Sequence, residues 1–275
     1  MTKLFLSLLL IALMETVVCA QNREFNDVIK LKRTPEPFLF SITTLTPADL
    51  KWSIDYSASY GERISRSFGN EGIGQQFGIK GYLGSQLTLY ANASLGFTGD
   101  NKVTSAQRAE IIRDFIGGKK NRGFRLGLGV GIGRDYFNVK SFLSRITASY
   151  DANRWKAGAN LLVEKAFAGN RDAMDIITTL GFHYRLLGTL YGGFETAGED
   201  LEGFLDPQEA EGGAKLLLGP SINMTTNNSR LCFSVSGGPV FYGTHNKIIN
   251  TQAIRYLPSQ PGLTLRAKVI FNLSQ

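Results

Sequence analysis

The sequence has little cysteine and no long apolar run. Of its 2 cysteines, Cys19 lies in an N-terminal leader, so the remaining chain holds only Cys232 and cannot form an internal disulfide. No apolar run reaches the roughly 18 residues expected of a membrane-spanning helix, and the mean hydropathy is −0.06. These absences argue against a disulfide scaffold and a helical membrane protein. A transmembrane barrel escapes this test, because every second residue of its strands faces the lumen.

Groups that carry catalysis or bind nucleic acid are also scarce. The chain has 2 histidines, His183 and His245, and no carboxylate pair, metal-ligand spacing or nucleophile elbow stands out. The net charge is +7, but the basic residues are spread singly and form no run or basic helix. We therefore predict no catalytic residue, no metal, no cofactor and no nucleic-acid partner.

The N-terminal residues have the pattern of an export signal. Lys3 precedes the apolar stretch Leu4–Met14, and Val18-Cys19-Ala20 offers a small-residue cleavage site. We predict a signal peptide over residues 1–20. Residues 21–48 lack a strand pattern and are interrupted by prolines. They are predicted to be either a periplasmic segment that leads into the first strand or a plug that folds back into a barrel spanning residues 49–275.

The clearest structural signal is FRLGLGVGIG, Phe124–Gly133. Large apolar residues alternate there with glycines and one arginine, which is typical of a strand with two different faces. A soluble sandwich needs bulky side chains on its core side and charge outside. This strand instead suits a wall between lipid and a crowded or water-filled lumen.

The same alternation recurs along the chain and predicts about twelve strands, within a range of 10–14. Thr104–Ile116 is the ambiguous segment, because its apolar residues also recur at helical spacing; we predict a strand. The other predicted strands are Leu50–Tyr60, Ile73–Leu83, Leu87–Phe97, Phe124–Gly133, Phe142–Tyr150, Trp155–Val163, Met174–Leu186, Leu190–Thr196, Ala214–Ile222, Leu231–Phe241 and Leu263–Leu273.

Connection lengths predict how the barrel is oriented. Connections after even-numbered strands are short, whereas those near Ala197–Glu209 and Tyr242–Gly262 are long. Bacterial barrels have short periplasmic turns and longer outer loops. With that orientation six aromatic residues are expected at the periplasmic membrane interface: Trp52, Phe124, Tyr150, Trp155, Tyr184 and Phe271.

From Leu50 to Leu273 this pattern resembles the outer-membrane β-barrel proteins of Gram-negative bacteria, of the porin or transporter type. Leu218–Ile222 with Ser236–Phe241 is similar to the late hairpins of small-solute transporters in that membrane. The resemblance implies an all-β, antiparallel, up-and-down transmembrane β-barrel in the outer membrane. It also implies contact with outer-membrane lipid and with the barrel-assembly machinery. Such families often end on an aromatic residue, but here Phe271 lies four residues before the end.

The residues that are predicted to face the lumen carry an excess of positive charge. Four are acidic, namely Asp55, Glu164, Asp175 and Glu195, and nine are basic, giving 9 − 4 = +5 without the ambiguous segment. The basic residues are Lys51, Lys80, Arg125, Arg145, Lys156, Arg185, Lys215, Arg266 and Lys268. Gly127, Gly129 and Gly131 are predicted to leave room for a solute or for residues 21–48, or to permit tight curvature.

These features predict passage of small hydrophilic solutes, with a bias toward anions, through a narrow basic lumen. A closed structural or binding barrel whose outer loops contact a partner is the first alternative. In that alternative the lumen charges pair across strands and fill the interior. An enzyme built on a barrel is the second alternative, and the lack of a catalytic constellation disfavours it.

Overall fold

The structure is a computed structural model. It describes residues 38–47, 52–64, 70–98, 102–117, 122–152, 154–167, 174–204, 214–226, 230–243 and 261–273. The predicted signal peptide, residues 21–37, Lys51 and His245 lie outside these ranges.

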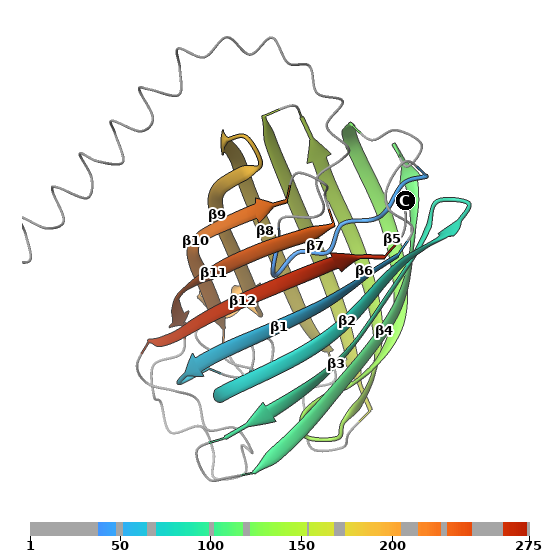
Figure 1. Ribbon diagram of the computed structural model, residues 1–275. Helices are drawn as coiled ribbons and strands as arrows, with labels where there is room; N and C mark the ends of the chain where they lie inside the picture. Colours follow the sequence, from blue (N-terminus) through green and yellow to red (C-terminus); the bar gives the residue numbers. More distant parts are fainter. Residues whose placement is uncertain are drawn as a thin grey trace, which may run out of the picture. The chain divides into compact units, whose positions relative to one another are not determined.

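Twelve antiparallel strands form one closed barrel (Figure 1). Their bounds are β1 Trp52–Glu62, β2 Gly72–Gly84, β3 Leu87–Phe97, β4 Val103–Ile116, β5 Gly123–Arg134, β6 Lys140–Asp151, β7 Trp155–Ala166, β8 Met174–Leu187, β9 Leu190–Glu199, β10 Lys215–Thr225, β11 Leu231–Tyr242 and β12 Gly262–Asn272. A 3₁₀ turn, η2 Leu201–Phe204, follows β9. Among the described residues, no helix is long and apolar enough to cross a membrane.

Each strand pairs with its neighbours in the sequence, and β1 closes the ring by pairing with β12 from Ser53↔Asn272 to Glu62↔Leu263. The predicted up-and-down barrel is confirmed. The ambiguous segment Thr104–Ile116 lies within β4, whose register against β3 and β5 excludes a helix there. Closure leaves no unpaired strand edge, as a barrel in lipid requires.

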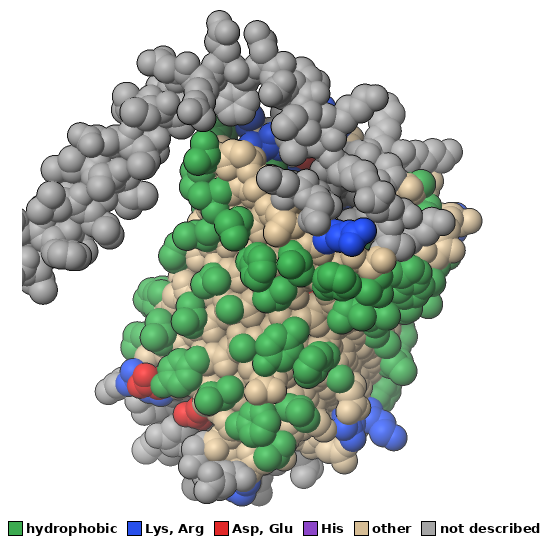
Figure 2. All heavy atoms as spheres, viewed as in Figure 1, with side chains coloured by type: hydrophobic (Ala, Val, Ile, Leu, Met, Phe, Trp, Pro, Cys, Tyr) green, Lys and Arg blue, Asp and Glu red, His purple; other side chains and the backbone are tan. Residues whose placement is uncertain are grey.

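The two faces of the wall differ as the alternation predicts. Large hydrophobic side chains point outward, among them Phe77, Ile132 and Leu265, each at least half exposed. Figure 2 shows such side chains spread over one face of the barrel, with charged side chains toward its ends. Inward positions are polar and buried, for example Thr88, Asn160 and Ser234.

The first and last strands fix which end of the barrel is which. β1 begins and β12 ends at one rim, together with the tight β2–β3 and β8–β9 turns. The two longest connections, residues 200–214 and 243–261, both belong to the opposite rim. Bacterial barrels carry their long loops on the outer side, so we refer to the first rim as the periplasmic rim and to the second as the outer rim; this orientation stays a prediction.

The glycines of β5 make room for inward side chains of β4. Gly129 is in register with Ile112, and Gly131 with Glu110. A Cβ atom at Gly129 would lie 2.8 Å from Cγ1 of Ile112, and one at Gly131 would lie 2.6 Å from Cγ of Glu110. The bare strip is therefore covered by the neighbouring strand, which explains how an apolar Ile112 can point inward.

The buried Glu110–Arg145 pair, which joins β4 to β6 across this strip, predicts a measurable stability effect. Nε and Nη2 of Arg145 donate to the carboxylate of Glu110 at 2.7 and 2.9 Å, and the Glu110 side chain is 0 % exposed. Because Glu110→Gln leaves a buried guanidinium without its counter-charge, we expect the free energy of unfolding to fall by about 3 kcal/mol. Urea unfolding in lipid vesicles, followed by tryptophan fluorescence, measures this change.

Glu62→Gln is the control, because Glu62 forms an exposed pair with Arg63 at 3.3 Å. Exposed pairs contribute little, so its unfolding midpoint should match the wild type. Equal midpoints for Glu110→Gln and Glu62→Gln would contradict the role given to the buried pair.

Candidate functional site in the barrel lumen

Residues Phe38–Pro47, which we call the luminal segment, lie inside the barrel. In Figure 1 they form the blue trace that runs within the ring of strands, toward the rim where β12 ends. Phe38, Ser41, Thr44 and Thr46 are buried. The segment's partners come from β3, β4, β5, β7, β8, β9 and β12, so contacts from around most of the barrel converge on it.

Phe38 occupies a seat formed by two facing glycines. Gly158 of β7 and Gly181 of β8 are register partners, and a Cβ atom on either would collide with the Phe38 ring. The ring meets His183 edge-on, with 5.1 Å between ring centroids. The backbone carbonyl of Phe38 accepts a hydrogen bond from Nζ of Lys268 at 2.6 Å.

Buried polar side chains of the wall bind the backbone of the segment. Oε2 of Glu195 accepts the N–H groups of Leu39 and Phe40 at 2.8 and 2.9 Å. The amide of Asn160 accepts from N–H of Ile42 at 2.7 Å and donates to its carbonyl at 2.8 Å. Backbone groups of an irregular segment need partners when they are buried, and the wall supplies them here.

The segment is held again near the periplasmic rim. The hydroxyl of Thr44 donates to the carboxylate of Asp114 at 2.7 Å, and Nη1 of Arg125 donates to the Thr44 carbonyl at the same distance. The hydroxyl of Thr88 accepts from N–H of Leu45 at 2.8 Å. Thr88, Asp114 and Arg125 lie close to the β2–β3 and β4–β5 turns, at the rim where β1 begins.

Several predicted lumen charges pair across strands. Lys215 contacts Glu199 of β9 at 2.9 Å, and Lys156 contacts Asp151 of β6 at 3.4 Å. β4, which the sequence count left out, adds inward Arg108, Glu110 and Asp114. Because Glu110, Asp114 and Glu199 are all buried carboxylates, they reduce the excess of basic groups inside the barrel.

The other predicted site residues are placed as follows. Lys80, Arg125, Arg145, Lys156 and Lys215 are buried inward, whereas Arg185, Arg266 and Lys268 are half-buried. Arg185 donates to the hydroxyl of Tyr191 at 2.7 Å, next to the β8–β9 turn. Residues with contacts to the luminal segment are Arg125, Arg266 and Lys268.

The predicted interface aromatics point out of the barrel wall. Phe124, Tyr150, Tyr184 and Phe271 are exposed, whereas Trp52 and Trp155 are half-buried. Trp155 stacks on Tyr150 with 4.7 Å between ring centroids and on Phe182 at 5.9 Å. Offset stacks of this kind contribute about 0.5–1.5 kcal/mol beyond their burial. Their place at the membrane interface stays a prediction.

A cavity of about 200 Å³ lies above the luminal segment, toward the outer rim. Leu39, Phe40 and Ile42 form its floor. Arg134, Asp135 and Tyr136, at the β5–β6 connection, line it on the side of the outer rim. Its walls carry polar and charged side chains from β2, β3, β4, β6, β7, β8 and β12. We call this space the outer cavity.

Sequence reasoning missed Gly158, Gly181 and Asn160, which hold the segment. The available signal was weak: two inward glycines with a polar residue two positions from the first, within otherwise ordinary strands. Only the register of β7 against β8 brings the glycines face to face.

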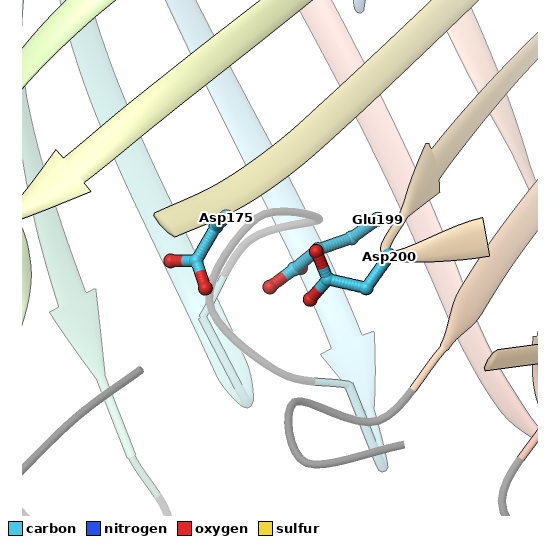
Figure 3. A group of neighbouring side chains, drawn as sticks. All are labelled: Asp175, Glu199 and Asp200. Atoms are coloured by element: carbon cyan, nitrogen blue, oxygen red, sulfur yellow. The ribbon is translucent and has the colours of Figure 1, made fainter. Parts of the chain in front are cut away.

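Near the outer rim, Asp175, Glu199 and Asp200 form a cluster of carboxylates (Figure 3). One ligand atom of each lies within 4.8 Å of the others. Glu199 already accepts a hydrogen bond from Lys215, and Oδ1 of Asp200 accepts N–H of Ile176 at 3.1 Å. A carboxylate cluster alone does not define a metal site, so we assign no cation to it.

Solved structures with a similar fold include outer-membrane porins. The NanC porin matches with a TM-score of 0.55 at 8% identity, covering 80% of this chain and 100% of that one. The KdgM porin in complex with disordered oligogalacturonate matches with a TM-score of 0.54 at 9% identity, covering 80% and 99%. The fold of this chain is therefore a closed β-barrel of the kind that these porins have. At these identities the likeness shows the fold alone.

No protein-family model matches the sequence, and a comparison with curated proteins found no match.

The glycine seat of Phe38 generates a second prediction. Gly181→Val should push the ring out of its seat and loosen the luminal segment, because the added side chain would occupy the same space. We expect chymotrypsin to cleave after Phe38 or Phe40 about tenfold faster in the refolded barrel, because local opening governs such cleavage. Mass spectrometry of the released N-terminal peptide locates the cut.

The matched control is Gly192→Val in β9, where the added side chain meets the flexible end of Leu186 on the outside of the wall. Cleavage in this variant should keep the wild-type rate. If Gly181→Val were as resistant as Gly192→Val, the proposed seat would be wrong.

Proposed function

We propose that this protein is an outer-membrane channel for small hydrophilic solutes, with a bias toward anions, and that the luminal segment holds it closed. The observation that carries the proposal is the segment inside a closed barrel, with a polar cavity above it. A barrel that only had to be stable would not need an irregular segment in its lumen. The backbone of such a segment requires hydrogen bonds from buried side chains of the wall. We also propose that the protein lies in the outer membrane, as the porins with a similar fold do, and that it is not an enzyme.

The bias toward anions is supported by what the segment covers. Among the described residues, the basic side chains that contact it include Arg125, Arg266 and Lys268. The carboxylates that contact it include Asp114 and Glu195. Movement of the segment would remove one partner from each of these groups. The basic side chains would then face the pore, and rings of basic side chains along a pore favour anions.

A closed structural barrel is the second candidate, and the cross-strand pairs Glu110–Arg145 and Glu199–Lys215 favour it. Such pairs fill the lumen and order it without providing a path. In this alternative the segment is a permanent part of the interior.

Conductance of the refolded mature chain in planar bilayers tests the channel. We expect the chain from Gln21 onward to show rare, small steps, and a variant lacking residues 21–47 to conduct steadily, because the lumen loses its obstruction. A variant lacking only residues 21–37 is the matched control, since it keeps the luminal segment and should stay nearly closed. A variant without residues 21–47 that inserts into the membrane but stays silent would reject the channel and favour the structural barrel.

The reversal potential of the variant lacking residues 21–47, measured under a KCl gradient, tests selectivity. We expect anions to be preferred, and Lys268→Glu to shift the reversal potential toward cations, because it exchanges a luminal positive charge for a negative one. Arg122→Glu, at an exposed position of the β4–β5 connection, should leave the potential unchanged. A cation-selective pore in the parent variant would contradict the proposed bias.

A further inference from the structure

The outer cavity has the charge of an anion site. Its charged lining residues are two carboxylates, Asp135 and Glu164, and four guanidinium groups, those of Arg108, Arg134, Arg145 and Arg266. Nε and Nη2 of Arg145 are committed to Glu110. Arg108 lies 3.6 Å from Glu164 and 3.9 Å from Glu110, outside the range of a short hydrogen bond. A guanidinium offers a planar fork that matches a carboxylate.

The rest of the lining suits a hydroxylated molecule. Gln76, Asn92 and Gln107 bring amides, and Tyr90 and Tyr136 bring phenol groups. Amides and hydroxyls both donate and accept hydrogen bonds, as a polyhydroxylated solute requires. At about 200 Å³ the cavity lies below the range of about 300–1,000 Å³ for drug-sized ligands. It therefore fits a small solute.

Three lining residues are coupled to the luminal segment. The guanidinium of Arg266 lies over the Phe40 ring, 4.7 Å from its centroid. The hydroxyl of Thr179 is hydrogen-bonded to that of Ser41 at 2.9 Å. Nη1 of Arg145 donates at 3.1 Å to Oδ1 of Asn160, the same oxygen that accepts the N–H of Ile42. A molecule in the cavity would touch groups that hold the segment.

We propose that the outer cavity binds a small hydroxylated carboxylate, and that binding releases the luminal segment and opens the channel. The opening step rests on the proposed function; the binding site does not. The ligand carboxylate would bind the N–H groups at the edge of Arg266, whereas the Phe40 ring contacts its guanidinium at 4.7 Å. Because a charge-assisted hydrogen bond is stronger than a cation–π contact, the proposed opening requires the guanidinium to shift toward the anion, which would weaken its contact with the ring. The segment then loses a contact at its centre.

Coupling of this kind is reciprocal, because an anion that destabilises the seated segment must bind more tightly once the segment is released. Weakening the segment's hold on Arg266 should therefore raise anion affinity. Typical couplings between two sites change affinity by about 5- to 150-fold.

The test uses gluconate as the probe and glucose as its uncharged counterpart. Equilibrium dialysis of the refolded mature protein in detergent measures binding, and planar bilayers measure opening. We expect saturable binding of gluconate but not glucose, and a rise in open probability when gluconate is added at the outer rim. Arg266→Gln should lose most of the affinity, and Arg266→Lys should retain part of it through its charge.

Phe40→Leu is the decisive variant, because it keeps an apolar side chain but removes the ring. We expect gluconate affinity to rise about fivefold or more. Phe115→Leu is the matched control: Arg113 lies over the Phe115 ring at 5.6 Å on the outside of the wall, so this variant removes a similar contact away from the lumen. Its affinity should equal the wild-type value.

The outcomes separate the two proposals. Equal gluconate affinities in wild type and Phe40→Leu would overturn the coupling. No saturable binding, in a protein that conducts once residues 21–47 are removed, would overturn the anion site and leave the proposed channel standing. Silence of that truncated variant would overturn the channel and with it the opening step, and dialysis would still decide the anion site on its own.

Discussion

The constraint on which the structure depends is that every backbone polar group within a lipid layer needs a partner inside the protein. Closure of β1 on β12 meets it for the wall, because no strand of the ring keeps a free edge. The same constraint shapes the interior. A segment without secondary structure lies in the lumen, so its N–H and C=O groups must find side chains. Glu195 and Asn160 supply these partners for the middle of the segment.

Two kinds of contact fill the barrel, and they have different consequences. Cross-strand pairs such as Glu110–Arg145 join strands that stay together in any state of the barrel. Contacts such as Glu195 with Leu39 join the wall to a segment that continues into β1 only at the periplasmic rim. We expect loss of the first kind of contact to destabilise the wall. In the proposed channel, loss of the second kind would release the luminal segment and leave the wall intact.

Much of the wall was predictable from the sequence because period-two alternation is a local signal. It predicted all twelve strands, including β4, where the helical spacing of Ala106, Ala109 and Ile112 was misleading. Ile112 can point inward because Gly129 faces it from β5, a pairing that only the register reveals. The contacts of the luminal segment were not predictable in this way. Leu39 and Glu195 are 156 residues apart, and a segment without periodicity does not indicate which wall residue it meets.

Arg266 belongs to the wall and also contacts the luminal segment. It lies on β12, the strand that closes the ring, and its side chain lines the outer cavity and contacts the Phe40 ring in the cavity floor. Its backbone is held in the wall, and its guanidinium would contact both the luminal segment and an anion in the proposed site. In the proposed mechanism the wall does not have to move, because the change is confined to side chains that line the cavity, such as Arg266 and Thr179, and to the luminal segment that they contact.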